Sequence, residues 1–330
     1  MPDQAPSRAD TPELRIRLAA DPASVPGARR FVTDGLTSWG LPDLVDDAAL
    51  CVSELAGNAA LHSASTFMEI VLRSLEASVR LSVEDDGEVP AAAVVPRPSF
   101  PDPDDELDLL LLDDEPTTGR GLAIVSVLAD DWGVEATEAG KRIWVDLTGS
   151  GAPHGVTQPR TGPQQAPPAT PAGLPVGWAL VRLAGCPVQL SLRQDQHLDE
   201  LIRELQLVQY DSRDRDNPRS RELASELEGL LSGPAHARHT GRRVAQQAAA
   251  EGRTEIDVEM AMPREFAASI VQLQETVRAA DRLCEEMRLL TLASSADLRR
   301  LRAWMTEEIV AQAAHDAAPV RWEDWLAARP

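Results

Sequence analysis

The stretch that says most about the fold is Glu54-Leu55-Ala56-Gly57-Asn58-Ala59-Ala60-Leu61-His62. Its composition predicts a helix, on which Glu54, Asn58 and His62 are four residues apart and therefore share one face. Asparagine is a poor helix former and stands at only two positions of the chain, 58 and 217, so a copy inside a helix indicates a role for its amide. On this segment alone, a solvated polar face remains the alternative.

Two later segments add an acidic turn and a glycine-rich helix start. Val79 to Val83 alternates apolar and polar residues, as a half-buried strand does, and leads after Glu84 into the acidic turn Asp85-Asp86-Gly87. Further on, Thr117-Thr118-Gly119-Arg120-Gly121-Leu122 opens an apolar helical run. Free backbone amides at such a helix start suit a phosphate group.

In this order, the three segments resemble the motifs of the GHKL, or Bergerat-fold, ATP-binding family, which includes gyrase-type ATPases, histidine-kinase catalytic domains and anti-sigma-factor serine kinases. The nearest resemblance is to the last group, over residues 13–149. It implies an α+β fold: a Bergerat-type two-layer α/β sandwich, with helices on a mixed sheet. The matching positions are Glu54, Asn58-Ala59 and His62 for the first motif, Asp85-Asp86-Gly87 for the second, and Gly119-Arg120-Gly121-Leu122 for the third.

The resemblance implies ATP and Mg²⁺ as ligands. Asn58 would hold Mg²⁺ through its amide oxygen, since this ion takes a few hard oxygen ligands and keeps several waters. Glu54 is the catalytic candidate, as a carboxylate that positions or deprotonates an attacking hydroxyl. Asp85 would accept a hydrogen bond from the adenine amine. The other residues predicted to bind ATP are Gly87, which admits the base, and the lid residues Thr118, Gly119, Arg120, Gly121 and Leu122.

Several positions keep a second interpretation or depart from the family. Asp86 is expected to be a solvated turn carboxylate, and His62 a helix-face residue. Arg120 is open between a phosphate contact and a surface position. Glu88-Val89-Pro90 replaces a second glycine, and Thr117 stands where some anti-sigma-factor kinases carry arginine, so binding is better supported than transfer. The acidic block 101–115 contains an apolar run, Leu109 to Leu112, suited to docking on a partner or the second domain.

Composition predicts a soluble, cytoplasmic protein of two domains. The chain has 330 residues, 43% of them hydrophobic, and a net charge of -21, which opposes nucleic-acid binding. Its start, residues 1–10, lacks an apolar signal core, and no apolar run approaches the length of a membrane span. The isolated cysteines, Cys51, Cys186 and Cys284, indicate buried free thiols. The expected parts are a disordered tail over 1–12, the ATP-binding domain over 13–149, a Pro-rich linker over 150–175, and a mostly helical regulatory or partner-binding domain over 176–330.

In the second half, Trp178 to Leu183 and Val188 to Leu192 are predicted to be a short strand pair with Gly185 at the turn, followed mainly by helices and a strand over Ile256 to Met260. His197, Asp199 and Glu200 are close enough in sequence to suggest a metal site, but neighbouring charges on one helix favour a surface.

Two functions follow from these observations. The first is a serine/threonine-protein kinase that phosphorylates a serine on an anti-anti-sigma antagonist and controls transcription through partner switching. The alternative is a catalytically inactive, nucleotide-gated protein that sequesters a sigma factor or another regulator. Whether phosphate is transferred stays open, as does a homodimer, which is common in relatives of this type. A histidine kinase is disfavoured because only a short tail precedes the ATP-binding segment.

Overall fold

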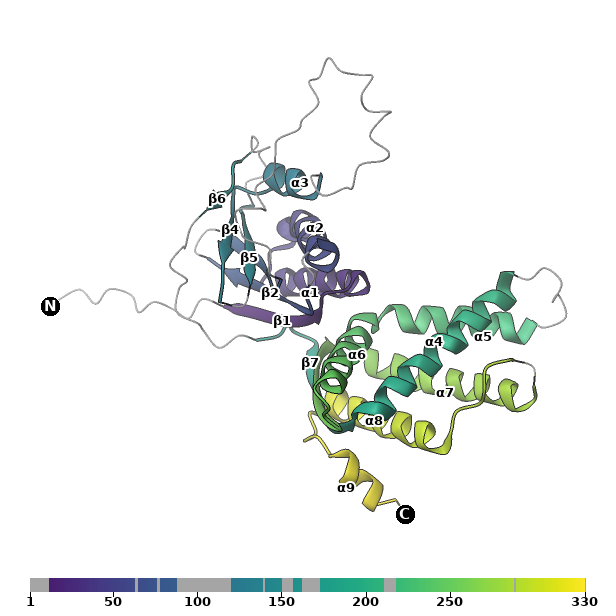
Figure 1. The fold of residues 1–330 in the computed structure, drawn as a ribbon. Helices are drawn as coiled ribbons and strands as arrows, with labels where there is room; N and C mark the ends of the chain where they lie inside the picture. Colours follow the sequence, from purple (N-terminus) through teal and green to yellow (C-terminus); the bar gives the residue numbers. More distant parts are fainter. Residues whose placement is uncertain are drawn as a thin grey trace. The chain divides into compact units, whose positions relative to one another are not determined.

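A computed structural model describes residues 12–62, 65–75, 78–87, 120–138, 140–149, 157–161, 173–210, 218–287 and 289–329. The chain forms two compact units, Met1–Val176 and Gly177–Pro330. Each unit has its own sheet and its own helices (Figure 1).

The first unit is built on a six-stranded mixed sheet with the order β1-β2-β3-β5-β4-β6. All neighbouring strands are antiparallel except β6, which runs parallel to β4. The strands are β1 (Glu13–Ala19), β2 (Phe67–Ser74), β3 (Val79–Asp85), β4 (Asp131–Ala136), β5 (Lys141–Leu147) and β6 (Arg160–Thr161).

Helices cover one side of this sheet (Figure 1). Along β1, Leu14, Ile16 and Leu18 are buried while Arg15 and Arg17 are exposed, so the predicted alternation places one face of the strand under the helices. The two layers confirm the expected α+β sandwich. Its helices are η1 (Pro22–Ser24), α1 (Val25–Ser38), η2 (Pro42–Leu44), α2 (Val45–His62) and α3 (Arg120–Leu128).

Parts of the segment 150–175, whose composition predicts a linker, lie on this sheet. β6 pairs with β4, and the Thr157 amide donates to the Ser126 carbonyl at 2.9 Å. Gly173 exchanges backbone hydrogen bonds with the edge strand β1, donating to the Glu13 carbonyl at 2.8 Å and accepting from the Arg15 amide at 3.0 Å. Unpaired edge groups of a sheet attract such additions, which composition does not reveal.

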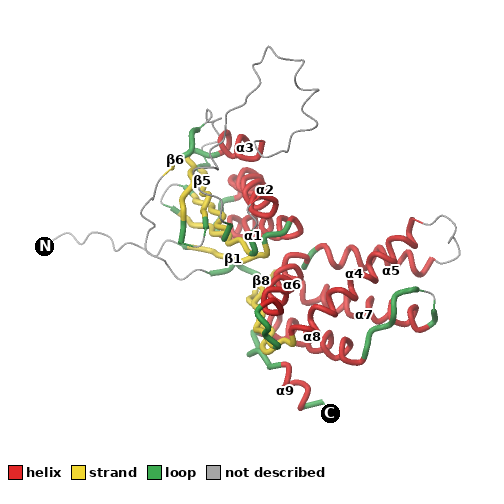
Figure 2. Tube along the Cα trace, viewed as in Figure 1, coloured by secondary structure: helices red, strands yellow, loops and turns green. Residues whose placement is uncertain are grey.

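The second unit is mostly helical, as predicted, and contains one antiparallel strand pair (Figure 2). Within the described residues, none of the helices of either unit is long and apolar enough to cross a membrane. The elements are β7 (Trp178–Pro187), α4 (Val188–Tyr210), α5 (Pro218–Ser232), α6 (Ala235–Ala250), β8 (Glu255–Pro263), α7 (Phe266–Glu285), α8 (Ala296–His315) and α9 (Trp322–Ala327).

The predicted hairpin at Gly185 is wrong. β7 continues through Gly185 to Pro187, Val188 begins α4, and the partner of β7 is the distant strand β8. Gly185 has a φ of +64° and lies where the register between the two strands shifts. Its amide donates to Asp257 Oδ1 at 2.8 Å, so the glycine forms a bulge within a strand instead of a turn between two strands.

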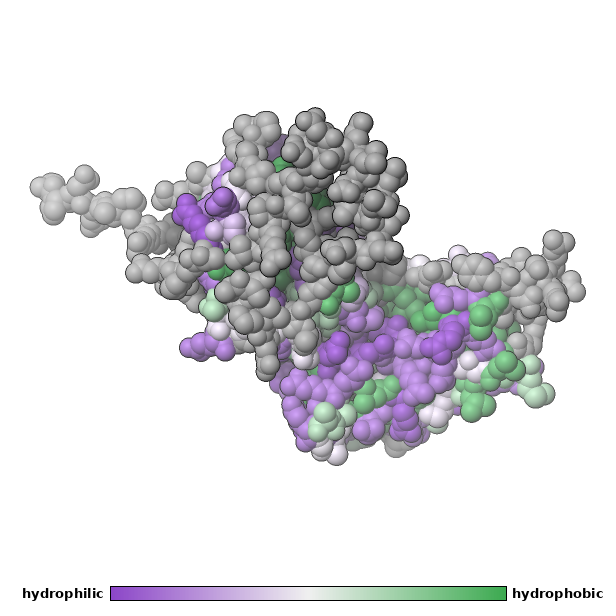
Figure 3. All heavy atoms as spheres, turned by 45° about the horizontal axis from the view of Figure 1, so that its top comes forward, coloured by the Kyte–Doolittle hydropathy of each residue, from purple (hydrophilic) through white to green (hydrophobic). Residues whose placement is uncertain are grey.

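The cysteines lie inside the fold, and some large apolar side chains lie on its surface. All three cysteines are free and buried, as predicted. Figure 3 shows a surface in which hydrophilic residues predominate among the coloured atoms, with separate hydrophobic patches. Large apolar side chains that are exposed include Leu207, Leu290 and Leu292.

The bulge gives a stability prediction for the second unit. Gly185→Ala should lower the free energy of unfolding by about 1–2 kcal/mol, because the left-handed backbone disfavours a Cβ, and that Cβ would also lie 2.9 Å from Arg321 Nη2. Gly229→Ala is the control: Gly229 lies in α5, a Cβ added there would have nothing within 4 Å, and the change should raise stability by up to about 1 kcal/mol. Urea denaturation measures the free energy of unfolding of both variants, and equal changes in the two would contradict the bulge.

Candidate functional site

The first part of the site lies on α2, whose apolar face packs into the core of the first unit. Glu54 and Asn58 lie beside that face and are half-buried, so their polar ends are at the edge of the core. The side chain of His62 lies outside the described residues. The buried residues of α2 are Ala48, Cys51, Val52, Leu55, Ala56 and Ala59.

The start of α3 packs directly on this polar face of α2. A Cβ at Gly121 would lie 2.6 Å from Glu54 Oε2 and 3.6 Å from Asn58 Nδ2, so a larger residue here would require the end of the Glu54 side chain to shift. Leu122, the next residue, is buried and anchors α3 in the core. The first and third sequence motifs are therefore in contact, although more than sixty residues separate them.

Asp85 forms the second part of the site, at the end of β3. Its Oδ1 accepts hydrogen bonds from Ser65 Oγ at 3.0 Å, from the Gly87 amide at 3.0 Å and from Lys141 Nζ at 2.9 Å. Both Asp85 and Lys141 are buried. The acidic turn is thus folded around the Asp85 carboxylate, and Gly87 is part of that turn.

Lys141 is the site residue that the sequence analysis missed. It is directly opposite Asp85 in the β3–β5 register, which places the two side chains on the same face of the sheet. The sequence did single out this residue, because Lys141 is the only lysine of the chain. The only lysine of the chain thus lies beside the predicted adenine residue, with its ammonium group bonded to that carboxylate.

The neighbouring Asp86 has a structural role. It is exposed, and its Oδ1 accepts hydrogen bonds from the amides of Thr66 at 2.8 Å and Phe67 at 3.4 Å. Asp86 therefore fixes the start of β2 next to the turn. The expected solvated carboxylate is exposed as predicted but is bonded to the backbone.

Several predicted residues cannot be placed on the site. Thr118 and Gly119 lie outside the described residues, as do Thr117, Glu88-Val89-Pro90 and the acidic block 101–115. Arg120 is the first residue of α3, but its side chain is not described. The described lid residues are Gly121 and Leu122.

The donors on α2 fit a magnesium ion that also binds phosphate. One carboxylate and one carboxamide are too few to hold an ion alone, but Mg²⁺ normally takes few protein ligands beside phosphate oxygens and water. Within the described ranges, no group of three or more His, Cys, Asp or Glu side chains could hold a metal. Asn58, with Glu54 beside it, would hold the ion.

Cys51 lies one turn before Glu54 and is excluded as a nucleophile. Burial, with the nearby carboxylates of Asp47 and Glu54, raises the pKa of this thiol to about 12. The thiol therefore stays protonated at neutral pH, and a protonated thiol does not attack phosphorus or carbon centres.

In the second unit, His197, Asp199 and Glu200 each have a different partner. His197 Nε2 is 2.9 Å from Ser294 Oγ, and Asp199 pairs with Arg238 and Arg242. Glu200 accepts a hydrogen bond from Gln196. These bonds account for the three side chains structurally, as expected for charges on one helix.

Comparison with known proteins supports the interpretation of the first unit. Residues 18–147 match the family described as Histidine kinase-like ATPase domain, of the GHKL superfamily. The match runs from the end of β1 to the end of β5 and includes the Glu54, Asp85 and Gly121 segments. No curated protein matches the chain. Residues 18–147 are therefore similar to an ATPase-type nucleotide-binding domain, and the match supports ATP binding as the general function of this part of the chain.

The Asp85–Lys141 pair gives a prediction that needs no ligand. Lys141→Met and Asp85→Asn should each lower the free energy of unfolding by about 3 kcal/mol, because each leaves a buried polar partner uncompensated. The double variant should lose at least about 1 kcal/mol less than the sum of the two, since the partners are in contact. Urea denaturation measures this cycle, and strictly additive effects would show that the ion pair is absent in solution.

Proposed function

We propose that the first unit binds ATP with Mg²⁺ and transfers the γ-phosphoryl group to a serine of a partner protein. The proposed protein is a regulatory kinase of the anti-sigma-factor type, whose antagonist and sigma factor are the partners and whose output is transcription. The observation that carries this proposal is the contact of Gly121, at the start of α3, with Glu54 and Asn58 on α2. It brings a helix N-terminus, a carboxylate and a carboxamide to one place.

Each of these groups has a defined task in phosphoryl transfer. The amides of the first turn of α3 are suited to phosphate oxygens, because a helix start has free N–H groups and a positive dipole end. The oxygen of Asn58 would hold Mg²⁺, and the ion would neutralise charge on the phosphates. The half-buried Glu54 carboxylate would orient the serine hydroxyl and accept its proton.

The serine oxygen forms a bond to the γ-phosphorus while the bond between that phosphorus and the bridging oxygen of ADP breaks. The hydroxyl proton goes to a Glu54 oxygen, and ADP leaves with the electron pair of the broken bond. The products are ADP and a phosphoserine protein.

Adenine recognition is proposed at Asp85. Among the described residues, the three hydrogen bonds to this carboxylate all go to Oδ1, so Oδ2 is the oxygen left to accept from the exocyclic amine. Lys141 holds Oδ1 from the opposite strand and so orients Oδ2. A base with a carbonyl in place of the amine, such as guanine, would bring an acceptor to an acceptor and should bind poorly.

Nucleotide binding is tested by calorimetric titration of the full chain with ATP and Mg²⁺. Asn58→Ala should weaken Mg-ATP binding by roughly tenfold or more and remove most of the dependence on Mg²⁺, because one of the few protein ligands is lost. Asp85→Ala should weaken ATP binding and lose the preference over GTP. Asp47→Ala, an exposed carboxylate on the same helix, is the control and should bind as the wild type does. Wild-type protein that fails to bind Mg-ATP would overturn the proposal.

Phosphoryl transfer is tested with labelled ATP and candidate antagonist proteins. Glu54→Ala should bind ATP within about twofold of the wild type but transfer phosphate at least roughly a hundredfold more slowly, since general base catalysis contributes that much or more. If the wild type binds ATP normally but neither it nor any variant gives labelled product, the kinase is refuted. The alternative, a nucleotide-gated sequestering protein, then remains. That alternative requires partner affinity to differ among ATP, ADP and no nucleotide.

A further inference from the structure

The second unit contains a cavity of about 150 Å³ between the β7–β8 strand pair and the helices packed against it. Its lining comes from β7, β8 and helices α4 to α8. Most of the walls are apolar, including Leu198 from α4 and Val258, Met260 and Met262 from β8. An apolar space of this volume accommodates a single-ring organic molecule.

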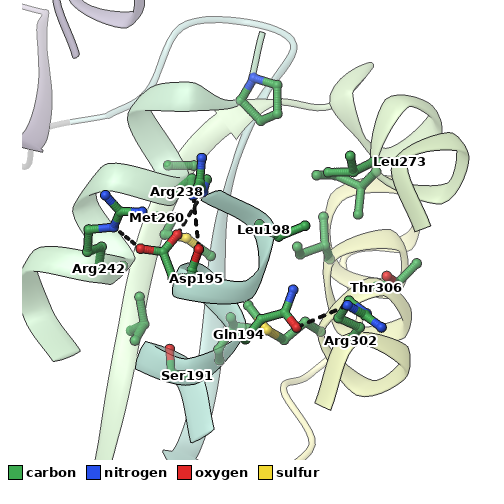
Figure 4. A pocket seen from close by; sticks show the side chains of 18 of the residues that line it. Ser191, Gln194, Asp195, Leu198, Arg238, Arg242, Met260, Leu273, Arg302 and Thr306 are labelled. Atoms are coloured by element: carbon green, nitrogen blue, oxygen red, sulfur yellow. Dashed lines mark hydrogen bonds and ion pairs between the residues drawn. The ribbon is translucent and has the colours of Figure 1, made fainter. Parts of the chain in front are cut away.

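The charged groups of the lining are already bonded to protein partners (Figure 4). On one side, Arg302 of α8 donates from Nη1 to Gln194 Oε1 at 3.3 Å. On the other side, Asp195 of α4 pairs with Arg238 and Arg242 of α6. A ligand that relied on one of these charges would compete with the partner already in place.

Gln274 of α7 is a polar side chain of this lining whose carboxamide is unbonded. It lies on the same face of α7 as Ile270, Leu273 and Val277, which also line the cavity, and it is only 7% exposed. Within the described part of the chain, its side chain has no hydrogen-bond partner. Unlike Arg302 Nε, which is enclosed by protein atoms, the Gln274 amide keeps accessible surface and can be reached. A carboxamide held among apolar walls without a partner costs free energy, so a ligand group that satisfies it would be stabilised there.

A cyclic amide is the ligand group that matches this carboxamide best. Gln274 carries its oxygen and an N–H on the same side of one planar group, so it can accept and donate at once. A ring also holds the N–H and the C=O of its amide on one side, which allows two hydrogen bonds side by side. A ketone would use only the donor and a hydrocarbon neither, and the unused polar atoms would stay in apolar surroundings.

An anionic ligand is disfavoured by the same carboxamide. The oxygens of a carboxylate would meet Oε1 of Gln274 as well as Nε2, and the anion would lose its hydration among apolar walls. Arg278 and Arg299 add positive charge near Arg302, but both side chains are exposed, where water and salt screen them. The lining therefore favours an uncharged ligand.

We propose that this cavity binds a small, uncharged cyclic amide, and that Gln274 donates from Nε2 to the ligand carbonyl and accepts at Oε1 from the ligand N–H. The apolar part of the ligand ring packs against the leucine, valine and methionine side chains of the walls. The second unit is then a sensory module for such a molecule. This site is independent of the nucleotide site in the first unit, and it stands or falls separately from the proposed kinase.

The ligand class is tested on the full-length protein by ligand-observed NMR titration with three probes of similar size. δ-Valerolactam carries the N–H and the C=O, cyclohexanone has only the C=O, and cyclopentanecarboxylate adds a charge. δ-Valerolactam should bind at least roughly tenfold more tightly than cyclohexanone, because the ketone leaves Oε1 of Gln274 unpaired. It should also bind at least about tenfold more tightly than cyclopentanecarboxylate, because a carboxylate loses its hydration. Equal or tighter binding of either other probe, or no binding of any probe, would overturn the proposal.

Two variants of α7 locate the recognition group. Gln274→Leu removes both polar atoms of the side chain, so the preference for δ-valerolactam over cyclohexanone should fall to near onefold. Its melting temperature should equal or exceed that of the wild type, because an apolar group replaces an unpaired buried amide. Gln272→Leu makes the same change on the exposed face of α7 and should keep the wild-type preference. An unchanged preference in Gln274→Leu, or a clear fall in its melting temperature, would overturn the assignment of Gln274.

Gly241→Ala tests the location without relying on Gln274. Gly241 lines the cavity, and its new Cβ would lie 3.7 Å from Val258 Cγ1 and 3.9 Å from Met260 Sδ, which is ordinary contact. The variant should therefore fold, with a melting temperature equal to or above that of the wild type, because alanine is the better helix former. It should bind both δ-valerolactam and cyclohexanone several-fold more weakly. Unchanged affinities would place the probes elsewhere and overturn the proposal.

Discussion

The approach of Gly121 to the polar face of α2 is the constraint on which the first unit depends. A Cβ at this position would lie 2.6 Å from Glu54 Oε2, so the absence of a side chain at Gly121 lets the start of α3 lie against Glu54 and Asn58 without displacing the Glu54 carboxylate. The same contact places a helix N-terminus beside a carboxylate and a carboxamide, a combination that suits the metal-bound triphosphate of the proposed function. The contact between α3 and α2 therefore both shapes the first unit and supports its proposed function.

Asp85 and Lys141 show how the sheet completes a site that no local sequence motif contains. The two residues are separated by 56 positions, and only the antiparallel register of β3 and β5 places them opposite each other. A buried ion pair is a weak source of net stability but a strong constraint on geometry, because either partner alone would be costly to bury. The pair therefore orients the Asp85 carboxylate more than it stabilises the domain.

The second unit is organised by a strand pairing between distant segments. β7 and β8 are separated by helices α4 to α6, and the cavity under them collects side chains from seven elements. Apolar residues at a period of 3.6, as at Leu198, Leu201, Ile202 and Leu205 of α4, were sufficient to predict that helices dominate this unit. That periodicity could not predict a cavity, because cavities arise where the packing of several helices leaves space, and packing depends on shapes that are far apart in sequence.

What the sequence alone determined about this protein is local in character. The helix with Glu54 and Asn58, the strand leading into Asp85, and the alternation in β1 follow from periodicities of 3.6 and 2 residues, which any single segment displays. The tertiary structure alone decided three other features: the pairing of Lys141 with Asp85, the continuation of β7 through Gly185, and the placement of Gly173 on the edge of β1. Each depends on strand register or on groups that meet across the fold, and a pattern read along one segment carries no record of its distant partner.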